Sequence, residues 1–202
     1  MIILTVKRRF ELSIVSAFIL CLLLSFATFS ANADKIEKSV LRLHILANSD
    51  STYDQNLKLK VRDEVLKYSE NILKNVSGKA QAKNIISEHK NELLSVAENV
   101  IKKEGNGESV ALELTKCYFE RRDYEDFSLP PGYYDAVRIK IGKAKGHNWW
   151  CVIFPKVCVG AAADITDNMT DGERDIVKNP DDYKIEFKIT ELIDSIKSRL
   201  FS

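Results

Sequence analysis

The sequence lacks the short motifs that identify many classes of enzyme. It has no G-x-S-x-G nucleophile motif, no phosphate-binding loop and no H-E-x-x-H zinc motif. It has three histidines and four cysteines, and the C-x6-C pair Cys151 and Cys158 has no second pair of ligands at the spacing of a zinc site. We therefore expect no metal site, no cofactor and no catalytic residues.

An excess of charge of one sign is also missing. The formal net charge is +1, and the first 33 residues hold three basic residues and one acidic residue, so that 27 basic and 28 acidic residues remain. With this balance the chain has no excess of positive charge to bind the phosphates of a nucleic acid, and we expect no nucleic-acid partner. The chain has no repeats and no low-complexity segment, and its 45% hydrophobic content is enough for the core of one domain.

The N-terminal segment 1–33 has the pattern of a signal peptide. The basic residues KRR at 7–9 precede an apolar run at 12–29, and an A-x-A site for signal peptidase follows at 31–33. We expect cleavage before Asp34. The alternative is an uncleaved anchor, because about 18 apolar residues come near the lower limit for crossing a bilayer. In both cases residues 34–202 form a single exported domain.

Hydrophobic periodicity predicts an α+β fold. Alternation with a period of two predicts strands at 39–47, 109–119 and 134–141, and a run with apolar residues on both faces predicts a central strand at 149–154. Apolar residues at helical spacing predict two long helices, from 51 to about 76 and from 79 to 103. Ser51 and Asp54 have the spacing of a capping box at the start of the first helix.

We expect the strands at 109–119, 134–141 and 149–154 to form an antiparallel meander covered by the two helices. A polar surface excursion with weak order is expected at about 160–182, before a short strand at 183–187. A C-terminal helix at 190–201 should dock on the body through Leu192, Ile193, Ile196 and Leu200. His89, on the apolar stripe of the second helix, is interpreted as a core or boundary histidine.

Export changes the interpretation of the cysteines, because disulfides persist outside the cytoplasm. Cys151 and Cys158 flank Pro155, which can turn the chain back, so a local bridge between them is possible. Cys117 would then remain a buried free thiol. The alternative is that all three cysteines are buried free thiols that pack as small apolar residues.

Two long segments resemble the stage II sporulation protein R family of endospore-forming bacteria. The segments are RLHILANSDSTYDQNLKLKVRDEVL at 42–66 and LPPGYYDAVRIKIGKAKGHNWWCVIFPKVC at 129–158. The resemblance covers about residues 34–159, and FKITELIDSIK near the C-terminus is also of the family type. Lys156 departs from the family, which usually has a second proline there, and this bears on the turn between Cys151 and Cys158.

The resemblance implies a developmental signal rather than an enzyme. Members of the family are made in the forespore and exported into the space between the forespore and mother-cell membranes. There they trigger a membrane-embedded aspartic protease of the mother cell, which removes the pro-sequence of the early mother-cell sigma factor. The resemblance therefore implies that the chain acts by binding this protease, and that it contacts the membrane through this partner or through an uncleaved leader.

The candidate partner-binding residues lie in the two family segments. We expect an exposed polar side on the strand 39–47, and the first group comprises Arg42, His44, Asn48, Ser49 and Asp50. The second group comprises Gly146, His147, Asn148 and Trp149. The structural alternative is that 48–51 only caps a helix and that one tryptophan points into the core. Because Ser51 can supply the cap, Asp50 is interpreted as free for a partner.

A second class of function is a secreted thiol-dependent hydrolase. Cys151 and Cys158 are the candidate nucleophiles, and His44 and His147 are the candidate bases. Against this class, Cys151 lies in an apolar strand, where burial raises the pKa of a thiol and makes it inert.

Overall fold

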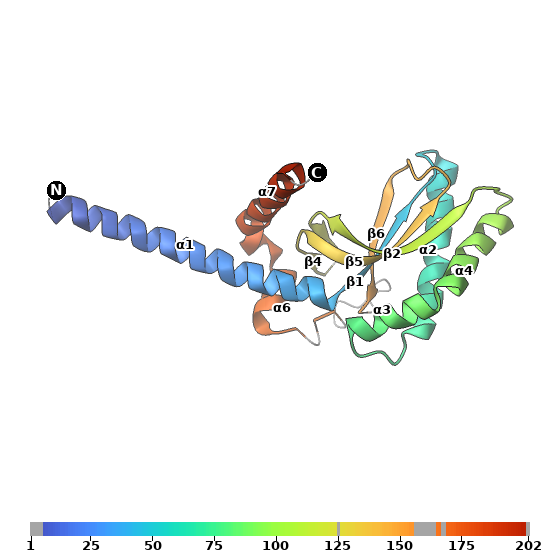
Figure 1. Cartoon of the computed structure of the whole chain (residues 1–202), viewed down its shortest axis with the longest axis horizontal. Coiled ribbons are helices and arrows are strands. Elements are labelled where there is room, and N and C mark those ends of the chain that lie inside the picture. The colour runs from blue at the N-terminus through green and yellow to red at the C-terminus, as the bar shows by residue number, and fades with distance from the viewer. Residues whose placement is uncertain (1–5, 125, 156–164, 167–168, 201–202) are drawn as a thin grey trace.

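The computed structural model describes residues 6–124, 126–155, 165–166 and 169–200. Its centre is a four-stranded mixed sheet with the order β2-β5-β1-β6 (Figure 1). The strands are β1 (Leu41–Leu46), β2 (Val110–Phe119), β5 (Gly132–Ile141) and β6 (Asn148–Phe154). The α+β class is confirmed, with a sheet that is mixed rather than antiparallel.

The expected antiparallel meander is wrong because β1 lies between β5 and β6. β2 pairs with β5 in antiparallel register, as expected, but β1 pairs with β5 in parallel and with β6 in antiparallel register. The first five residues of β1 are all buried, so both faces of this strand are covered. A strand buried on both faces belongs in the middle of a sheet.

The first face of the sheet is covered by α2 (Thr52–Ile72), α3 (Lys79–Glu88) and α4 (Lys90–Lys103). Apolar side chains of these helices and of the sheet form the first core, which includes Leu43, Ile45, Val61, Ile86, Leu93 and Ile139. The helix expected at 79–103 is two helices, because the backbone of His89 (φ −93°, ψ 20°) leaves the helical conformation. His89 lies at the boundary, with Nδ1 3.2 Å from the Tyr68 hydroxyl.

The second face of the sheet is covered by elements from both ends of the chain. These are the end of α1 (Val6–Ser39), the short pair β3 (Arg122–Asp123) and β4 (Ser128–Leu129), α6 (Asp171–Lys178), the 3-10 turn η1 (Pro180–Tyr183) and α7 (Lys184–Leu200). Apolar side chains of these elements and of the sheet form the second core, which includes Phe29, Ile36, Val40, Phe119, Tyr134, Val177 and Phe187. Part of the expected excursion, α6, is therefore an ordered helix with a capping box between Thr170 and Glu173.

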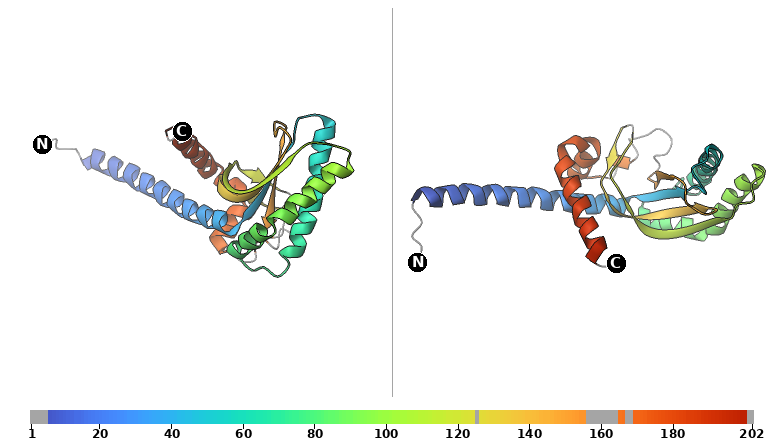
Figure 2. Two further views of the ribbon diagram at one scale, coloured as in Figure 1. Left: turned by 45° about the vertical axis from the view of Figure 1, so that its right-hand side comes forward. Right: turned by 90° about the horizontal axis from the view of Figure 1, so that it is seen from above.

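Two expectations for the C-terminal segment are wrong. The short strand expected at 183–187 is helical, because the chain passes from η1 directly into α7. The helix α7 does not dock through Leu192, Ile196 and Leu200, all of which are exposed, and its one buried side chain is Phe187. Figure 2 shows α7 running crosswise to α1 beside the point where α1 enters the domain.

Within the described residues, α1 is the one helix that is long and apolar enough to cross a membrane. Its apolar N-terminal part is exposed and projects away from the domain (Figure 1). Its last part is packed, with Phe29, Ala33 and Ile36 buried in the second core. The A-x-A site at 31–33 therefore lies inside a continuous helix.

Candidate functional site

The position of β1 brings together the two loops that hold most of the candidate residues. Leu46, the last residue of β1, pairs with Asn148 at the start of β6 and with Lys140 near the end of β5. The loop 47–51, which leaves β1, therefore meets the loop 142–147, which joins β5 to β6. We call these two loops the loop junction.

Hydrogen bonds from backbone amides hold the loop junction together. The amide of Gly146 donates to the Ala47 carbonyl at 2.9 Å, and the Asn48 side-chain oxygen accepts from the amide of Lys143 at 2.9 Å. A Cβ atom on Gly146 would lie 2.1 Å from the carbonyl oxygen of Ser49. The close approach of the two loops therefore requires a glycine at position 146.

Asp50 is a bridge between the loops. Its Oδ1 accepts a hydrogen bond from the amide of His147 at 2.6 Å and lies 2.5 Å from Nδ1 of the same residue. Two hydrogen bonds from His147 lower the pKa of the Asp50 carboxyl group. The bond from the backbone amide has the larger effect, and the bond from the ring has the smaller one. Asp50 is thus not needed for the helix cap, as expected, but its carboxylate joins the two loops, and its contact with a partner stays a prediction.

The start of α2 completes the support of the junction. The Ser51 hydroxyl accepts from the amide of Asp54 at 3.1 Å, which confirms Ser51 as the helix cap. The carboxylate of Asp54 accepts from the Ser49 hydroxyl and from the Asn48 side chain. Asn48 and Ser49 are thus half-buried supports of the loops, and their polar groups are already bonded.

Lys58 is a site residue that the sequence analysis missed. Its side chain is buried on α2, and its ammonium group donates to the carbonyl of His147 at 2.9 Å. Burial lowers the pKa of Lys58. The signal that could have identified it is its position beside Leu57 and Val61, on the side of α2 that faces the sheet.

The outer surface of the junction is polar and basic. The side chain of His147 is 81% exposed, and Lys143, Lys145 and Asn148 are exposed around it. Trp149 is half-buried, packs against the first core and lies under the guanidinium group of Arg62, 4.3 Å from the ring centre. The junction therefore presents a small polar surface on a rigid support, a suitable arrangement for binding a partner.

Arg42 and His44 lie apart from the junction, and the expectation that they are exposed is wrong. Arg42 is fully buried in the second core, with its guanidinium group 4.0 Å from the ring centre of Phe119 and 5.0 Å from that of Tyr134. One guanidinium nitrogen donates to the Tyr124 hydroxyl at 2.6 Å. Aromatic faces and this hydroxyl surround the cation, so its contacts are internal to the domain.

His44 is buried on the same face of β1. Its ring stacks on Trp150 with 3.8 Å between the ring centres and 11° between the planes. Burial lowers the pKa of His44 to about 4. His44 is therefore a neutral packing residue at neutral pH.

The structure places Cys151 and His44, a candidate nucleophile and a candidate base, on opposite faces of the sheet. Cys151 lies in the first core, whereas His44 stacks on Trp150 in the second, on the other face of the sheet. Cys117 is a half-buried free thiol, and burial raises its pKa. Cys158 lies outside the described residues, so its bridge to Cys151 stays a prediction. No group of three potential metal ligands occurs within the part of the chain that the structure describes.

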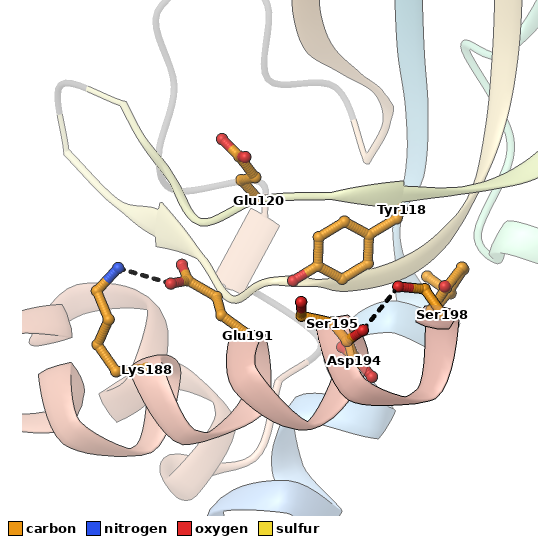
Figure 3. Close-up of a pocket in the computed structure, with 8 residues that line it drawn as sticks. Tyr118, Glu120, Lys188, Glu191, Asp194, Ser195 and Ser198 are labelled. Carbon is orange, nitrogen blue, oxygen red and sulfur yellow. Dashed lines mark hydrogen bonds and ion pairs between the residues drawn. The ribbon is translucent and has the colours of Figure 1, made fainter. Parts of the chain in front are cut away.

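A groove lies far from the loop junction (Figure 3). It is located between α7, the last residues of β2 and the first residues of β5. It has a volume of about 480 Å³ and is lined by Tyr118, Glu120, Tyr133, Lys188, Glu191, Asp194, Ser195 and Ser198. Burial raises the pKa of Tyr118 to about 12 and also raises that of Asp194. The lining residues of the groove show which side of α7 faces the sheet.

Comparison with known proteins identifies one family and one protein that match the region that holds the loop junction. The model of the family described as stage II sporulation protein R matches residues 37–164. Stage II sporulation protein R of Bacillus subtilis (strain 168) is 37% identical over 123 residues, which are 61% of this chain and 55% of that protein. The match thus spans little more than half of that relative's length. No solved structure matches. Most of α1 and all of α7 lie outside the matched region.

Proposed function

The chain belongs to the stage II sporulation protein R family, and from this premise we propose that it is an exported signal that activates a membrane-embedded aspartic protease during sporulation. The protease then removes the pro-sequence of a mother-cell sigma factor. The observation that carries the proposal is the family match over residues 37–164, which includes both loops of the junction. The apolar N-terminal helix is compatible with export from the forespore or with a membrane anchor.

Activation by a binding protein requires a difference in affinity. The signal must bind the competent state of the protease more tightly than the resting state, because only this difference shifts the population. The loop junction suits this role, since hydrogen bonds hold its loops in place before a partner arrives. A preorganised surface loses less conformational entropy on binding.

We propose that His147 and Asn148 are the contacts at the centre of this surface, with Lys143 and Lys145 at its edge. All four residues are exposed, three of them in the loop and Asn148 at the start of β6. Asn48, Ser49, Asp50 and Gly146 act by positioning them. Trp149, half-buried beneath, contributes the apolar part of the same surface.

The proposal is tested by producing the chain together with the protease and its pro-sigma substrate in cells that are not sporulating. Processing of the substrate, followed as a size change on a blot, should require the chain. His147→Ala should reduce processing at least tenfold, while the melting temperature stays close to that of the parent. The backbone groups of His147 that bond to Asp50 and Lys58 remain in this variant.

His89→Ala is the matched control, because His89 is another partly exposed histidine, located where α3 meets α4. With His89→Ala, the pro-sigma substrate should be processed as with the parent chain. No processing with the parent chain would refute the function itself. Normal processing with His147→Ala would leave the function and reject the loop junction as the contact surface.

A further inference from the structure

The helix α7 turns its polar side toward the domain. Glu191, Asp194, Ser195 and Ser198 line the groove opposite the sheet, as Figure 3 shows, with Tyr118 on the other wall. Phe187 alone of the residues Lys184–Leu200 is buried. This arrangement is the reverse of that in most surface helices, whose apolar side faces the core.

The apolar side of α7 is a continuous exposed stripe. Ile185, Ile189, Leu192, Ile196 and Leu200 follow one another at steps of three or four residues, and they are between 39% and 72% exposed. An exposed apolar surface of this kind marks a site of contact with a protein or a membrane. The stripe points away from the sheet, since the groove occupies the opposite side of the helix.

The position of α1 indicates what covers the stripe. Phe29 packs against Tyr183 and Phe187, with 5.7 Å and 5.5 Å between the ring centres, so the base of α1 touches the start of α7. From this base the exposed apolar part of α1 projects away from the domain (Figures 1 and 2). When α1 crosses a bilayer, α7, which runs crosswise to it, lies along the surface of that bilayer.

We propose that α7 is an interfacial membrane helix whose stripe, Ile185, Ile189, Leu192, Ile196 and Leu200, inserts into the bilayer beside α1. A helix with a polar face and an apolar face binds in the boundary between headgroups and acyl chains. By helical spacing, Arg199 lies at one border of the stripe with Lys188, which pairs with Glu191 at 2.6 Å, and Lys197 lies at the other border, beside Glu186. Long basic side chains in such positions reach back to lipid phosphates.

The proposal applies to the chain that retains α1, and the packing of Phe29 and Ala33 in the second core favours retention. It does not depend on the identity of the protease, because it concerns contact with lipid alone. It assigns a role to a helix outside the region that the family model matches. The domain would be held at a defined height and orientation above the membrane, with the loop junction at the far end of the sheet.

The test uses the full chain in vesicles of phosphatidylcholine and phosphatidylglycerol, with and without brominated acyl chains. A tryptophan is placed on the stripe (Leu192→Trp) or one turn further along on the groove side (Ser195→Trp), and the signal of Trp149 and Trp150 is subtracted with the parent chain. Bromine should quench the added fluorescence of Leu192→Trp at least twofold more than that of Ser195→Trp. Leu200→Trp should behave like Leu192→Trp, which guards against a local effect of one substitution.

Equal quenching at Leu192 and Ser195, or no quenching at either stripe position, would overturn the proposal. Absence of quenching together with cross-linked dimers would show that a second copy of the chain covers the stripe. The substituted side chains are exposed, so each variant is expected to fold. Each result can be obtained without the protease, and failure here leaves the proposed function unaffected.

Discussion

Arg42 is a buried cation whose neighbours are aromatic rings rather than carboxylates. Its guanidinium group contacts Phe119 and Tyr134 and donates to Tyr124. Burial lowers the pKa of Arg42, since the charged form is separated from water. The flat guanidinium fits between two rings in a way that an ammonium group cannot, so lysine is not an equivalent replacement.

Arg42→Ala should therefore lower the free energy of unfolding by about 3 kcal/mol, because it leaves a cavity and an unpaired Tyr124 hydroxyl. Arg42→Met should cost less, since methionine refills the space between the rings without a buried charge. Urea unfolding of the three proteins measures both differences. A partner-binding role for Arg42 predicts the opposite pattern, in which both variants are stable and both fail to activate the protease.

His44 makes the stability of the domain depend on pH. Its pKa is about 4 in the folded chain and 6.5 in the unfolded chain, so between these values the unfolded chain binds a proton that the folded chain does not. The contribution of His44 to stability is complete above pH 6.5 and decreases as the pH falls toward 4. Allowing for partial hydration, the loss is on the order of 2 kcal/mol.

His44→Phe should remove this part of the pH dependence, because phenylalanine keeps the stacking on Trp150 and cannot bind a proton. The measurement is the free energy of unfolding of parent and variant from pH 7 to pH 4. The parent should lose stability relative to the variant as the pH falls from 7 to 4. Curves that stay parallel over this range would contradict the assignment of the titration to His44.

At the scale of elements, the loop junction depends on the close approach of two loops. One loop follows β1, and the other joins β5 to β6. β1 pairs with both of these strands, which come from a distant part of the chain. The amide of Gly146 and the carboxylate of Asp50 join them directly. Separation of the loops should therefore impair both stability and the contact surface.

Gly146→Ala should lower stability by about 2 kcal/mol and reduce activation of the protease, because the new Cβ atom would collide with the Ser49 carbonyl oxygen. Gly107→Ala is the matched control, since a Cβ atom there meets nothing within 4 Å. Thermal unfolding and substrate processing are measured for both. Similar behaviour of the two variants would show that the loops tolerate separation and that the junction is not a unit.

At the scale of the whole molecule, the domain and its N-terminal helix form one folded body. Phe29 is buried between α1, η1 and α7, although it lies in the apolar run that precedes the A-x-A site. Cleavage before Asp34 would take Phe29 and Ala33 out of the second core. Retention of α1 therefore has a measurable effect on stability.

We expect the mature protein to retain α1 and to lose on the order of 3 kcal/mol of stability when Phe29 is replaced by alanine. Phe18→Ala, in the exposed part of the same helix, should leave stability unchanged. Unfolding of protein recovered from membranes measures both effects, and mass spectrometry identifies the first residue. Recovery of a chain that starts at Asp34, with no effect of Phe29→Ala, would show that signal peptidase removes the helix.

Local features of this protein can be read from its residues alone, because they depend on neighbours along the chain. The periodicity placed β1, β2, β5 and β6 and most of α2, and the spacing of Ser51 and Asp54 identified the start of α2. The two family segments were recognisable from their residues, and the family match confirms them. The leader pattern likewise identified the apolar N-terminal segment, which lies in α1.

The way these features combine depends on contacts between segments that are distant along the chain. The alternation of polar and apolar residues in β1 is the same whether its polar face is exposed to solvent or covered by a second core. The sequence therefore could not show whether Arg42 and His44 are exposed or buried. The insertion of β1 between β5 and β6 depends on pairing between distant segments, and this insertion joins Asp50 to His147. The stripe on α7 has the same helical spacing whether it faces a core or a membrane, and only the packing of Phe187 and the groove orients it away from the sheet.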